Sequence, residues 1–232
     1  MVLDDYVFRV EESVGDSYNL RTRYSLRRVD GEPIEPDLRF ESTENSAFGG
    51  NSSRICAYRL SEDGKTLWMD EEISSSQRQK DGKRHIITLE NLVRSDEENP
   101  VVLEFRRMVS YRANLTNEIR KFGNLPWDVQ NSEMETYRIS HIQLSRFGLH
   151  MEMKTPKPKL SEEKHFPDLT VSLLMQDGTV QPLENLHFGS RGNSESRRYD
   201  ATCETMFDAP ISLDDVRSLL VCGQPIPVRS DQ

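Results

Sequence analysis

Four Asp-Gly dipeptides divide this chain of 232 residues: Asp30-Gly31, Asp63-Gly64, Asp81-Gly82 and Asp177-Gly178. A tight hairpin turn needs backbone angles with φ > 0, which glycine adopts without strain and aspartate tolerates. Most of the alternating segments of the chain adjoin one of these pairs. The pairs therefore predict several hairpins and antiparallel sheets, and they carry no information about chemistry.

The segment from Tyr18 to Arg27 shows the alternation most clearly. One face carries the less polar residues, namely Tyr18, Leu20, Thr22, Tyr24 and Leu26. The other face carries three arginines, Asn19 and Ser25. A period of two with arginines on one side is typical of a strand that lies between a core and water. Together with similar runs elsewhere, this pattern predicts an all-β protein.

Composition favours two thin domains over a single thick one. Hydrophobic residues make up 35% of the chain and charged residues 30%, and two sandwiches expose more surface than one compact domain. Little apolar material occurs between Asn131 and Glu133, so we predict domains at residues 1–130 and 131–232. The net charge of −9 argues against a nucleic-acid partner, because phosphate binding requires a concentrated basic face.

The segment from Met108 to Phe122 fits two structures. Its apolar residues recur at steps of three and four, which favours a short helix. Its neighbours on both sides are typical of strands, and Asn114 and Thr116 are poor helix formers. The sequence leaves helix and strand open here.

Polar stretches separate the predicted strands. Residues 41–53, which contain Gly49-Gly50, predict a mobile loop, and the stretch from Thr155 to Pro167 predicts another. Ser212 followed by Asp214-Asp215 predicts a single helical turn, since acids favour the positive end of a helix. The chain contains no short repeat, which argues against a propeller or solenoid.

The three cysteines Cys56, Cys203 and Cys222 do not form a disulfide framework. Cys203 and Cys222 could meet on neighbouring strands, but small buried thiols are the favoured interpretation. No apolar run reaches the roughly 20 residues that cross a bilayer, and the first residues do not resemble a signal peptide. We therefore expect either a cytoplasmic protein or part of a longer one, and the early first strand favours the latter.

No cluster of acids or histidines indicates catalysis or metal binding. Adjacent acids on a strand point to opposite faces, so these pairs are predicted to be solvated: Asp4-Asp5, Glu11-Glu12, Glu71-Glu72, Glu162-Glu163 and Asp214-Asp215. The histidines are dispersed and form no metal motif: His85, His141, His150, His165 and His187. We expect no catalytic residue, no cofactor and no metal.

Two further motifs have simple interpretations. Gly189-Ser190-Arg191-Gly192 lacks the spacing of a nucleophile elbow and predicts a flexible loop. Basic residues interleave with aromatic ones over residues 105–122: Arg106-Arg107, Arg112 and Arg120-Lys121 with Phe105, Tyr111 and Phe122. Such a mixture can bind single-stranded nucleic acid, but the acids nearby favour a solvated outer face.

The chain resembles the extracytoplasmic region of membrane-anchored, anti-sigma-factor-like proteins of Gram-positive bacteria, a region largely assigned to domains of unknown function. The residues that carry the resemblance span nearly the whole sequence: Tyr18-Asn19-Leu20, Tyr24-Ser25-Leu26, Asp30-Gly31, residues 60–67, Gly123-Asn124-Leu125-Pro126-Trp127, residues 142–149, Asp177-Gly178-Thr179, Phe207-Asp208-Ala209-Pro210-Ile211, Asp214-Asp215-Val216 and Gly223-Gln224-Pro225-Ile226-Pro227. These are mostly turn and core positions. The resemblance implies two tandem immunoglobulin-like β-sandwiches with at most one or two short helices, outside the cell. In the family, a membrane helix and a cytoplasmic sigma-binding segment precede this region.

Three functions compete on this scaffold. The first is a non-catalytic sensing or interaction module, whose partner would be an envelope protein or a cell-wall ligand, with membrane attachment only through a helix absent from this chain. The second is an adhesin or carbohydrate-binding module, in which Trp68 or Trp127 would stack on sugars, although their apolar contexts favour the core. The third is a cell-wall-polymer hydrolase with separated carboxylates. Fold alone does not decide among them, and the first is our expectation.

Overall fold

The computed structural model describes residues 1–46, 52–75, 78–79, 82–95, 101–116, 118–123, 125–155, 169–192 and 199–228. Over these residues the chain forms β-strands, nearly all paired antiparallel, and one 3₁₀ turn, η1 (Leu213–Asp215). The all-β prediction is confirmed. The chain divides into two compact units, Met1–Thr116 and Asn117–Gln232.

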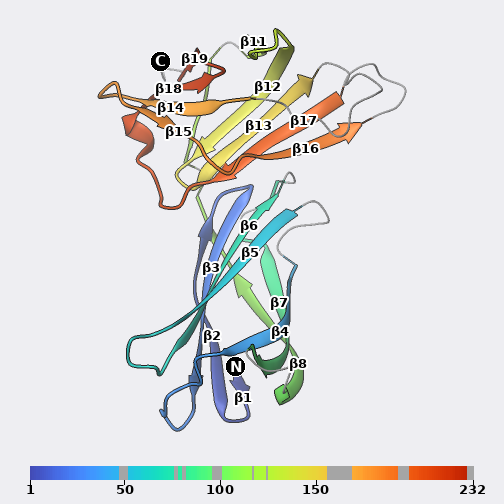
Figure 1. The fold of residues 1–232 in the computed structure, drawn as a ribbon, viewed down its shortest axis with the longest axis vertical. Coiled ribbons are helices and arrows are strands. Elements are labelled where there is room, and N and C mark those ends of the chain that lie inside the picture. The colour runs from blue at the N-terminus through green and yellow to red at the C-terminus, as the bar shows by residue number, and fades with distance from the viewer. Residues whose placement is uncertain are drawn as a thin grey trace. The chain divides into compact units, whose positions relative to one another are not determined.

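Unit 1 is a sandwich of two sheets, which can be followed in Figure 1. The larger sheet has the order β1-β2-β3-β6-β5, and β9 pairs with β2. Its strands are β1 (Val2–Leu3), β2 (Tyr6–Gly15), β3 (Asn19–Arg28), β5 (Ser52–Leu60), β6 (Leu67–Ser75) and β9 (Asn114–Leu115). The smaller sheet has the order β4-β7-β8, with β4 (Leu38–Asn45), β7 (Arg84–Arg94) and β8 (Val101–Arg112).

The core of unit 1 follows from the period of two. Tyr18 and the four less polar residues that follow it on β3 are all buried, and the alternate arginines of β3 lie on the other face. Across the sandwich, Leu89 and Leu92 of β7 belong to the same apolar cluster as Tyr24 and Leu26 of β3. Each sheet therefore has one apolar face, and burial of these two faces holds the unit together.

Unit 2 is a second sandwich. One sheet has the order β10-β12-β13-β17-β16, with β11 beside β12, and the other has the order β15-β14-β18-β19. The strands are β10 (Ile119–Arg120), β11 (Trp127–Gln130), β12 (Thr136–Ser145), β13 (Gly148–Thr155), β14 (Val171–Met175), β15 (Val180–Pro182), β16 (His187–Gly192), β17 (Tyr199–Met206), β18 (Val216–Val221) and β19 (Gln224–Pro227). Both sheets contribute to one apolar core, for example Leu149 and Met151 of β13 with Leu173 of β14 and Leu219 of β18.

The four predicted turn glycines all have positive φ, between 69° and 88°. Only two of them lie in hairpins, Gly64 between β5 and β6 and Gly178 between β14 and β15. Gly31 and Gly82 instead lie where the chain passes between the two sheets of unit 1. The two-residue hairpin of β18 and β19 uses Cys222-Gly223, with φ of 49° and 74°, which is the pattern of a type I′ turn.

Two other expectations need correction, and one alternative that the sequence left open is decided. The units meet at Thr116/Asn117, not at 130/131, because β10 and β11 both pair with β12 of unit 2. Residues 108–122 contain no helix over their described part, since β8, β9 and β10 occupy most of it. The predicted loop at 41–53 is strand at both ends, and Gly49-Gly50 and residues 156–168 lie outside the described residues. The predicted helical turn after Ser212 is present as η1.

Replacing Gly15 by alanine tests the tight connection between β2 and β3. A Cβ atom there would lie 2.1 Å from the backbone oxygen of Asn19, and backbone atoms cannot move aside without opening the turn. We expect Gly15→Ala to lower the free energy of unfolding of unit 1 by about 3 kcal/mol. Urea denaturation, combined with hydrogen exchange of peptides from β2 and β3, measures this.

Gly123→Ala, in unit 2, is a control for the glycine-to-alanine change itself, because a Cβ atom at Gly123 meets nothing within 4 Å. Its free energy of unfolding should change by less than about 0.5 kcal/mol. Equal effects of the two substitutions would contradict the assigned role of Gly15.

Candidate functional site

The most unusual side chain of unit 1 is Glu71, a carboxylate that is only 1% exposed. It lies on β6 in the inward row that also contains Leu67, Met69 and Ile73. Strand pairing places Thr22 of β3 on one side of it and Cys56 of β5 on the other. The prediction that the Glu71-Glu72 pair is solvated is therefore wrong for Glu71, whereas Glu72 faces outward and pairs with Arg21 at 2.9 Å.

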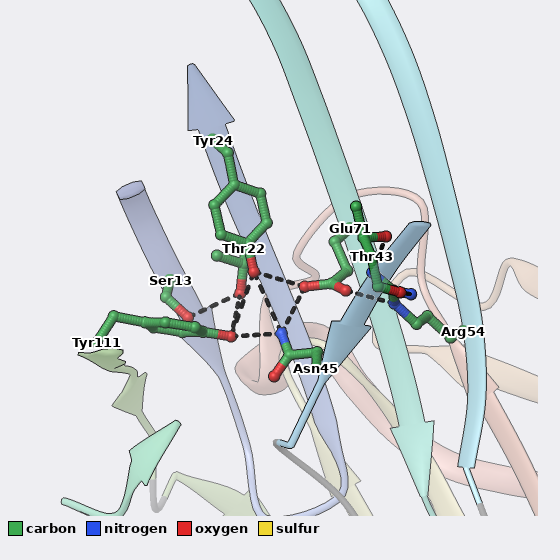
Figure 2. Close-up of polar contacts among 8 residues, drawn as sticks. All are labelled: Ser13, Thr22, Tyr24, Thr43, Asn45, Arg54, Glu71 and Tyr111. Atoms are coloured by element: carbon green, nitrogen blue, oxygen red, sulfur yellow. Dashed lines mark hydrogen bonds and ion pairs between the residues drawn. The ribbon is translucent and has the colours of Figure 1, made fainter. Parts of the chain in front are cut away.

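Donors from three different strands surround the Glu71 carboxylate (Figure 2). Tyr24 Oη of β3 donates to Oε2 at 2.5 Å, and Asn45 Nδ2 of β4 donates to the same oxygen at 2.6 Å. Arg54 Nε of β5 donates to Oε1 at 2.5 Å. A buried carboxylate is tolerated only when it is paired and its oxygens are hydrogen-bonded, and both conditions hold here.

The same polar cluster continues into the smaller sheet. Asn45 Nδ2 also donates to Tyr111 Oη of β8 at 2.7 Å, and Tyr24 Oη lies 3.3 Å from Tyr111 Oη. Thr22 and Ser13 extend it towards β2, with 2.9 Å between their hydroxyl oxygens. We call these residues, together with Arg54, Thr43 and Glu71, the Glu71 cluster.

Burial sets the protonation of the cluster. Desolvation raises the pKa of the Tyr24 phenol far above its ordinary value, and the neighbouring Glu71 carboxylate adds to the effect. Desolvation also raises the pKa of Tyr111. Burial alone would lower the pKa of the Arg54 guanidinium, but the Glu71 carboxylate, with smaller contributions from Cys56 and Tyr24, raises the pKa overall. The phenols therefore stay protonated and Arg54 stays charged.

His85 of β7 borders the cluster. It is buried, and its ring lies 5.5 Å from the ring of Tyr111, measured between centroids. Burial lowers its pKa, with a smaller contribution from Lys83. His85 therefore sits in the sandwich as a neutral imidazole packed on Tyr111.

A pocket of about 420 Å³ opens beside the cluster, between the edge strands β4 and β5. Its lining comes from alternate residues of β5 and from β4: Arg54, Cys56, Tyr58, Arg39, Phe40, Glu41 and Thr43. These two strands belong to different sheets, so side chains connect them. Arg54 donates to the backbone oxygen and to Oγ1 of Thr43, and the backbone N–H of Phe40 donates to Tyr58 Oη. The pocket lies where the shorter Cys56 leaves a gap between these two connections.

The Cys56 thiol and the Tyr58 phenol on the pocket wall are both protonated. Desolvation raises the pKa of the Cys56 thiol, although Arg54 lowers it in part. Desolvation also raises the pKa of Tyr58 to about 12. A nucleophilic cysteine requires the opposite shift, towards the thiolate. The Cys56 thiol is therefore not poised as a nucleophile.

Of the two tryptophans, Trp68 lies where the sequence did not predict it. It occupies the outward row of β6 and is half-buried, with the guanidinium carbons of Arg23 and Arg27 at 5.9 Å and 6.0 Å from its ring. The prediction that it belongs to the core is wrong. Trp127 packs against the core of unit 2 as a partly buried residue, as expected.

The basic and aromatic residues of positions 105–122 are divided between the two units. Phe105 and Tyr111 pack in the core of unit 1, whereas Phe122 packs in the core of unit 2. Arg120 binds the backbone oxygen of Leu213 and the Asp214 carboxylate. These aromatic rings are therefore not placed to stack on bases.

In unit 2, polar residues gather on one face of the sheet around β13. His150 is 1% exposed, and its ring nitrogens lie 3.3 Å from Glu204 and 3.5 Å from Glu152. The His141 ring is 6.2 Å away, measured between centroids. Within the described ranges, however, no three histidine, cysteine or acidic side chains converge as metal ligands.

The other candidate residues are dispersed. Cys56, Cys203 and Cys222 are free thiols, so the alternative of a Cys203–Cys222 disulfide is not realised. Residues 189–192 belong to strand β16, paired with β17, and not to a loop. His165 and Glu162-Glu163 lie outside the described residues.

Comparison with known proteins shows a similarity in fold to a solved structure and no match by sequence. No known family and no curated protein matches the sequence. The structure is similar to the crystal structure of "the conserved domain protein from Bacillus anthracis", with a TM-score of 0.57 and 11% identity over 95% of this chain and 74% of that chain. At this identity the likeness shows the fold alone. Among the described residues, no helix has the length and apolar character needed to cross a bilayer.

Replacing Arg54 by methionine tests the Glu71 cluster. The substitution keeps much of the side-chain volume but leaves the Glu71 carboxylate without its cation. We expect the free energy of unfolding to fall by about 3 kcal/mol, as when one partner of a buried pair is removed. Adding Glu71→Gln to the Arg54→Met variant should raise the free energy of unfolding again by at least about 1 kcal/mol, because the double variant no longer buries an unpaired carboxylate.

Arg23→Met is the control for that experiment. It breaks the Arg23–Asp70 pair, 2.6 Å apart on the outer face of the same sheet, and exposed pairs contribute at most about 1 kcal/mol. Urea denaturation measures both variants. A loss for Arg54→Met no larger than that for Arg23→Met would refute the structural role of the cluster.

Tyr58 makes the free energy of unfolding depend on pH in the alkaline range. Its pKa rises from 10.0 to about 12 on folding, so its contribution to stability is complete below pH 10 and is lost as pH rises towards 12. In that window the unfolded chain releases the proton and the folded one keeps it, at about 1.4 kcal/mol per pH unit. The fall in unfolding free energy between pH 10 and 11 should therefore be smaller in Tyr58→Phe than in the unaltered protein. Identical slopes would show that the phenol is not desolvated.

Proposed function

We propose that this chain is a non-catalytic interaction module from the extracytoplasmic region of a membrane-anchored, anti-sigma-factor-like protein. The observation that supports it best is the chemistry of the Glu71 cluster. Its carboxylate is neutralised by Arg54, its phenols are held protonated, and each group joins strands of the sandwich. A paired carboxylate and protonated phenols that join strands stabilise the sandwich. We therefore assign the interaction to the surface of the protein and not to this buried cluster.

The pocket between β4 and β5 gives this module a recess for a partner. Its mouth carries one exposed cation, Arg39, and one exposed anion, Glu41, and its wall carries the Tyr58 hydroxyl and the Cys56 thiol. A volume of about 420 Å³ lies near the lower end of ligand pockets. It suits a side chain or a small polar group presented by an envelope partner.

The extracytoplasmic location rests on the sequence resemblance. The residues that carry it lie at turns and in the two cores, for example Gly64 in the β5–β6 turn and Leu144 and Leu149 in the core of unit 2. They therefore support a shared scaffold. Membrane attachment would come from a helix outside this chain.

A cysteine at position 62 tests the location. Glu62 is exposed in the turn between β5 and β6, so Glu62→Cys places a reactive thiol on the surface. In intact cells of the native organism, a membrane-impermeant maleimide should label this variant to the same extent before and after permeabilisation. The unaltered protein serves as the control for labelling of Cys56, Cys203 and Cys222. Labelling only after permeabilisation would place the chain in the cytoplasm and refute the proposal.

A further inference from the structure

The outer face of the larger sheet of unit 1 carries an arginine cluster centred on Trp68. Strand pairing aligns Arg9 of β2, Ser25 of β3, Trp68 of β6 and Arg59 of β5 in one row across four strands. Arg27 lies beside this row on β3, with its guanidinium carbon 6.0 Å from the centroid of the Trp68 ring. Arg9, Arg27, Arg59 and Trp68 form what we call the Trp68 surface.

The positive charge of this surface is not balanced within the described residues. In the rows next to it, Arg23 pairs with Asp70 at 2.6 Å and Arg21 with Glu72 at 2.9 Å. Arg9, Arg27 and Arg59 are exposed and have no ion pair of this kind among the described residues. The Glu11 carboxylate accepts a hydrogen bond from Ser25 in the same row and offsets one of the three positive charges. The surface therefore keeps a net positive charge beside Trp68, in a chain of net charge −9.

Trp68 holds one arginine of this surface, Arg27, and its neighbour Arg23 in a defined arrangement. Its ring attracts the guanidiniums of Arg23 and Arg27 by cation–π interaction, worth about 0.5–1 kcal/mol at exposed sites. Arg23 is fixed further by its two hydrogen bonds to Asp70. Arginines held in this way lose less conformational entropy when they bind an anion.

The spacing of the charges indicates the kind of anion. Neighbouring strands are about 4.8 Å apart, so Arg9 and Arg59 are about 14 Å apart across the sheet. A single small anion cannot reach both. Duplex DNA, with one charge per roughly 1.7 Å, requires a denser basic face. A polymer with about one charge per repeating ring matches three arginines spread over this distance.

The shape of the surface favours a polysaccharide over a peptide. Peptides dock on sheets along a free strand edge or through pockets for alternate side chains. The row from Arg9 to Arg59 instead runs across four strands, in the plane of the sheet. We infer that the Trp68 surface binds a linear acidic polysaccharide, lying across the strands with its carboxylates on Arg9, Arg27 and Arg59. This inference rests on the proposed interaction role and names the chemistry of one ligand.

The probe for the test is an oligomer of polygalacturonate, with its fully methyl-esterified form as the uncharged counterpart. Binding to the intact chain is measured by calorimetry at low and at high ionic strength. We expect the acid form to bind at low ionic strength, to weaken as salt screens the charges, and to bind at least tenfold more tightly than the ester. Fluorescence of a Trp127→Phe variant, in which Trp68 is the remaining tryptophan, should change on binding.

Two triple variants with the same change in charge locate the binding surface. Arg9→Gln, Arg27→Gln and Arg59→Gln together should weaken binding at least tenfold. Arg84→Gln, Arg106→Gln and Arg112→Gln together remove three exposed arginines of the smaller sheet and should change affinity less than twofold. Circular dichroism and urea denaturation of both variants check that each is folded.

The outcomes separate this inference from the proposed function. Absence of binding, equal binding of the ester, or equal loss in the two triple variants would overturn the inference. Poly-glutamate or single-stranded DNA binding as tightly as the polyuronate would overturn the assignment to a polysaccharide. The thiol-labelling result at position 62 depends on none of these measurements, so the location can be refuted while the binding stands, or the reverse.

Discussion

A carboxylate lies between the two sheets of unit 1, and it can do so only because donors reach it from several directions. Tyr24, Asn45 and Arg54 come from β3, β4 and β5, and Asn45 continues the contact to Tyr111 of β8. Removing Arg54 would leave the charge without its cation, and removing Tyr24 or Asn45 would leave Oε2 with one donor in place of two. The Glu71 cluster therefore fixes the positions of four strands and gives the sandwich a specific register that apolar contacts alone do not impose.

The same constraint shapes the edge of the sandwich. β4 and β5 are edge strands of different sheets, and the Arg54–Thr43 and Tyr58–Phe40 contacts join them where backbone pairing does not. Cys56 lies between the longer side chains of Arg54 and Tyr58 on β5, and it leaves a recess there. The pocket is thus a consequence of how the cluster closes an open edge.

The all-β class, the alternation in β3 and the positive φ at the Asp-Gly glycines were predictable, because each depends on local backbone chemistry. The Glu71 cluster was not, because it joins residues as far apart as Tyr24 and Tyr111, which lie on different sheets and meet only when the two sheets pack together. One signal was available: Leu67, Met69 and Ile73 alternate with the outward residues, and Glu71 falls on their face. The same parity places Trp68 outside, although its neighbours Leu67 and Met69 suggested the core.

The two faces of the larger sheet of unit 1 differ in whether their charged side chains have ion-pair partners. This difference indicates where function lies. On the inner face, a charge without a partner would cost several kcal/mol, so Glu71 and Arg54 are paired for reasons of stability. On the outer face, water solvates a guanidinium at little cost, so pairing is optional. There the sheet pairs Arg21 and Arg23 with acids but leaves Arg9, Arg27 and Arg59 without such a pair among the described residues. Stability requires none of these three charges, and their grouping around Trp68 is best explained by a ligand that carries the opposite charge.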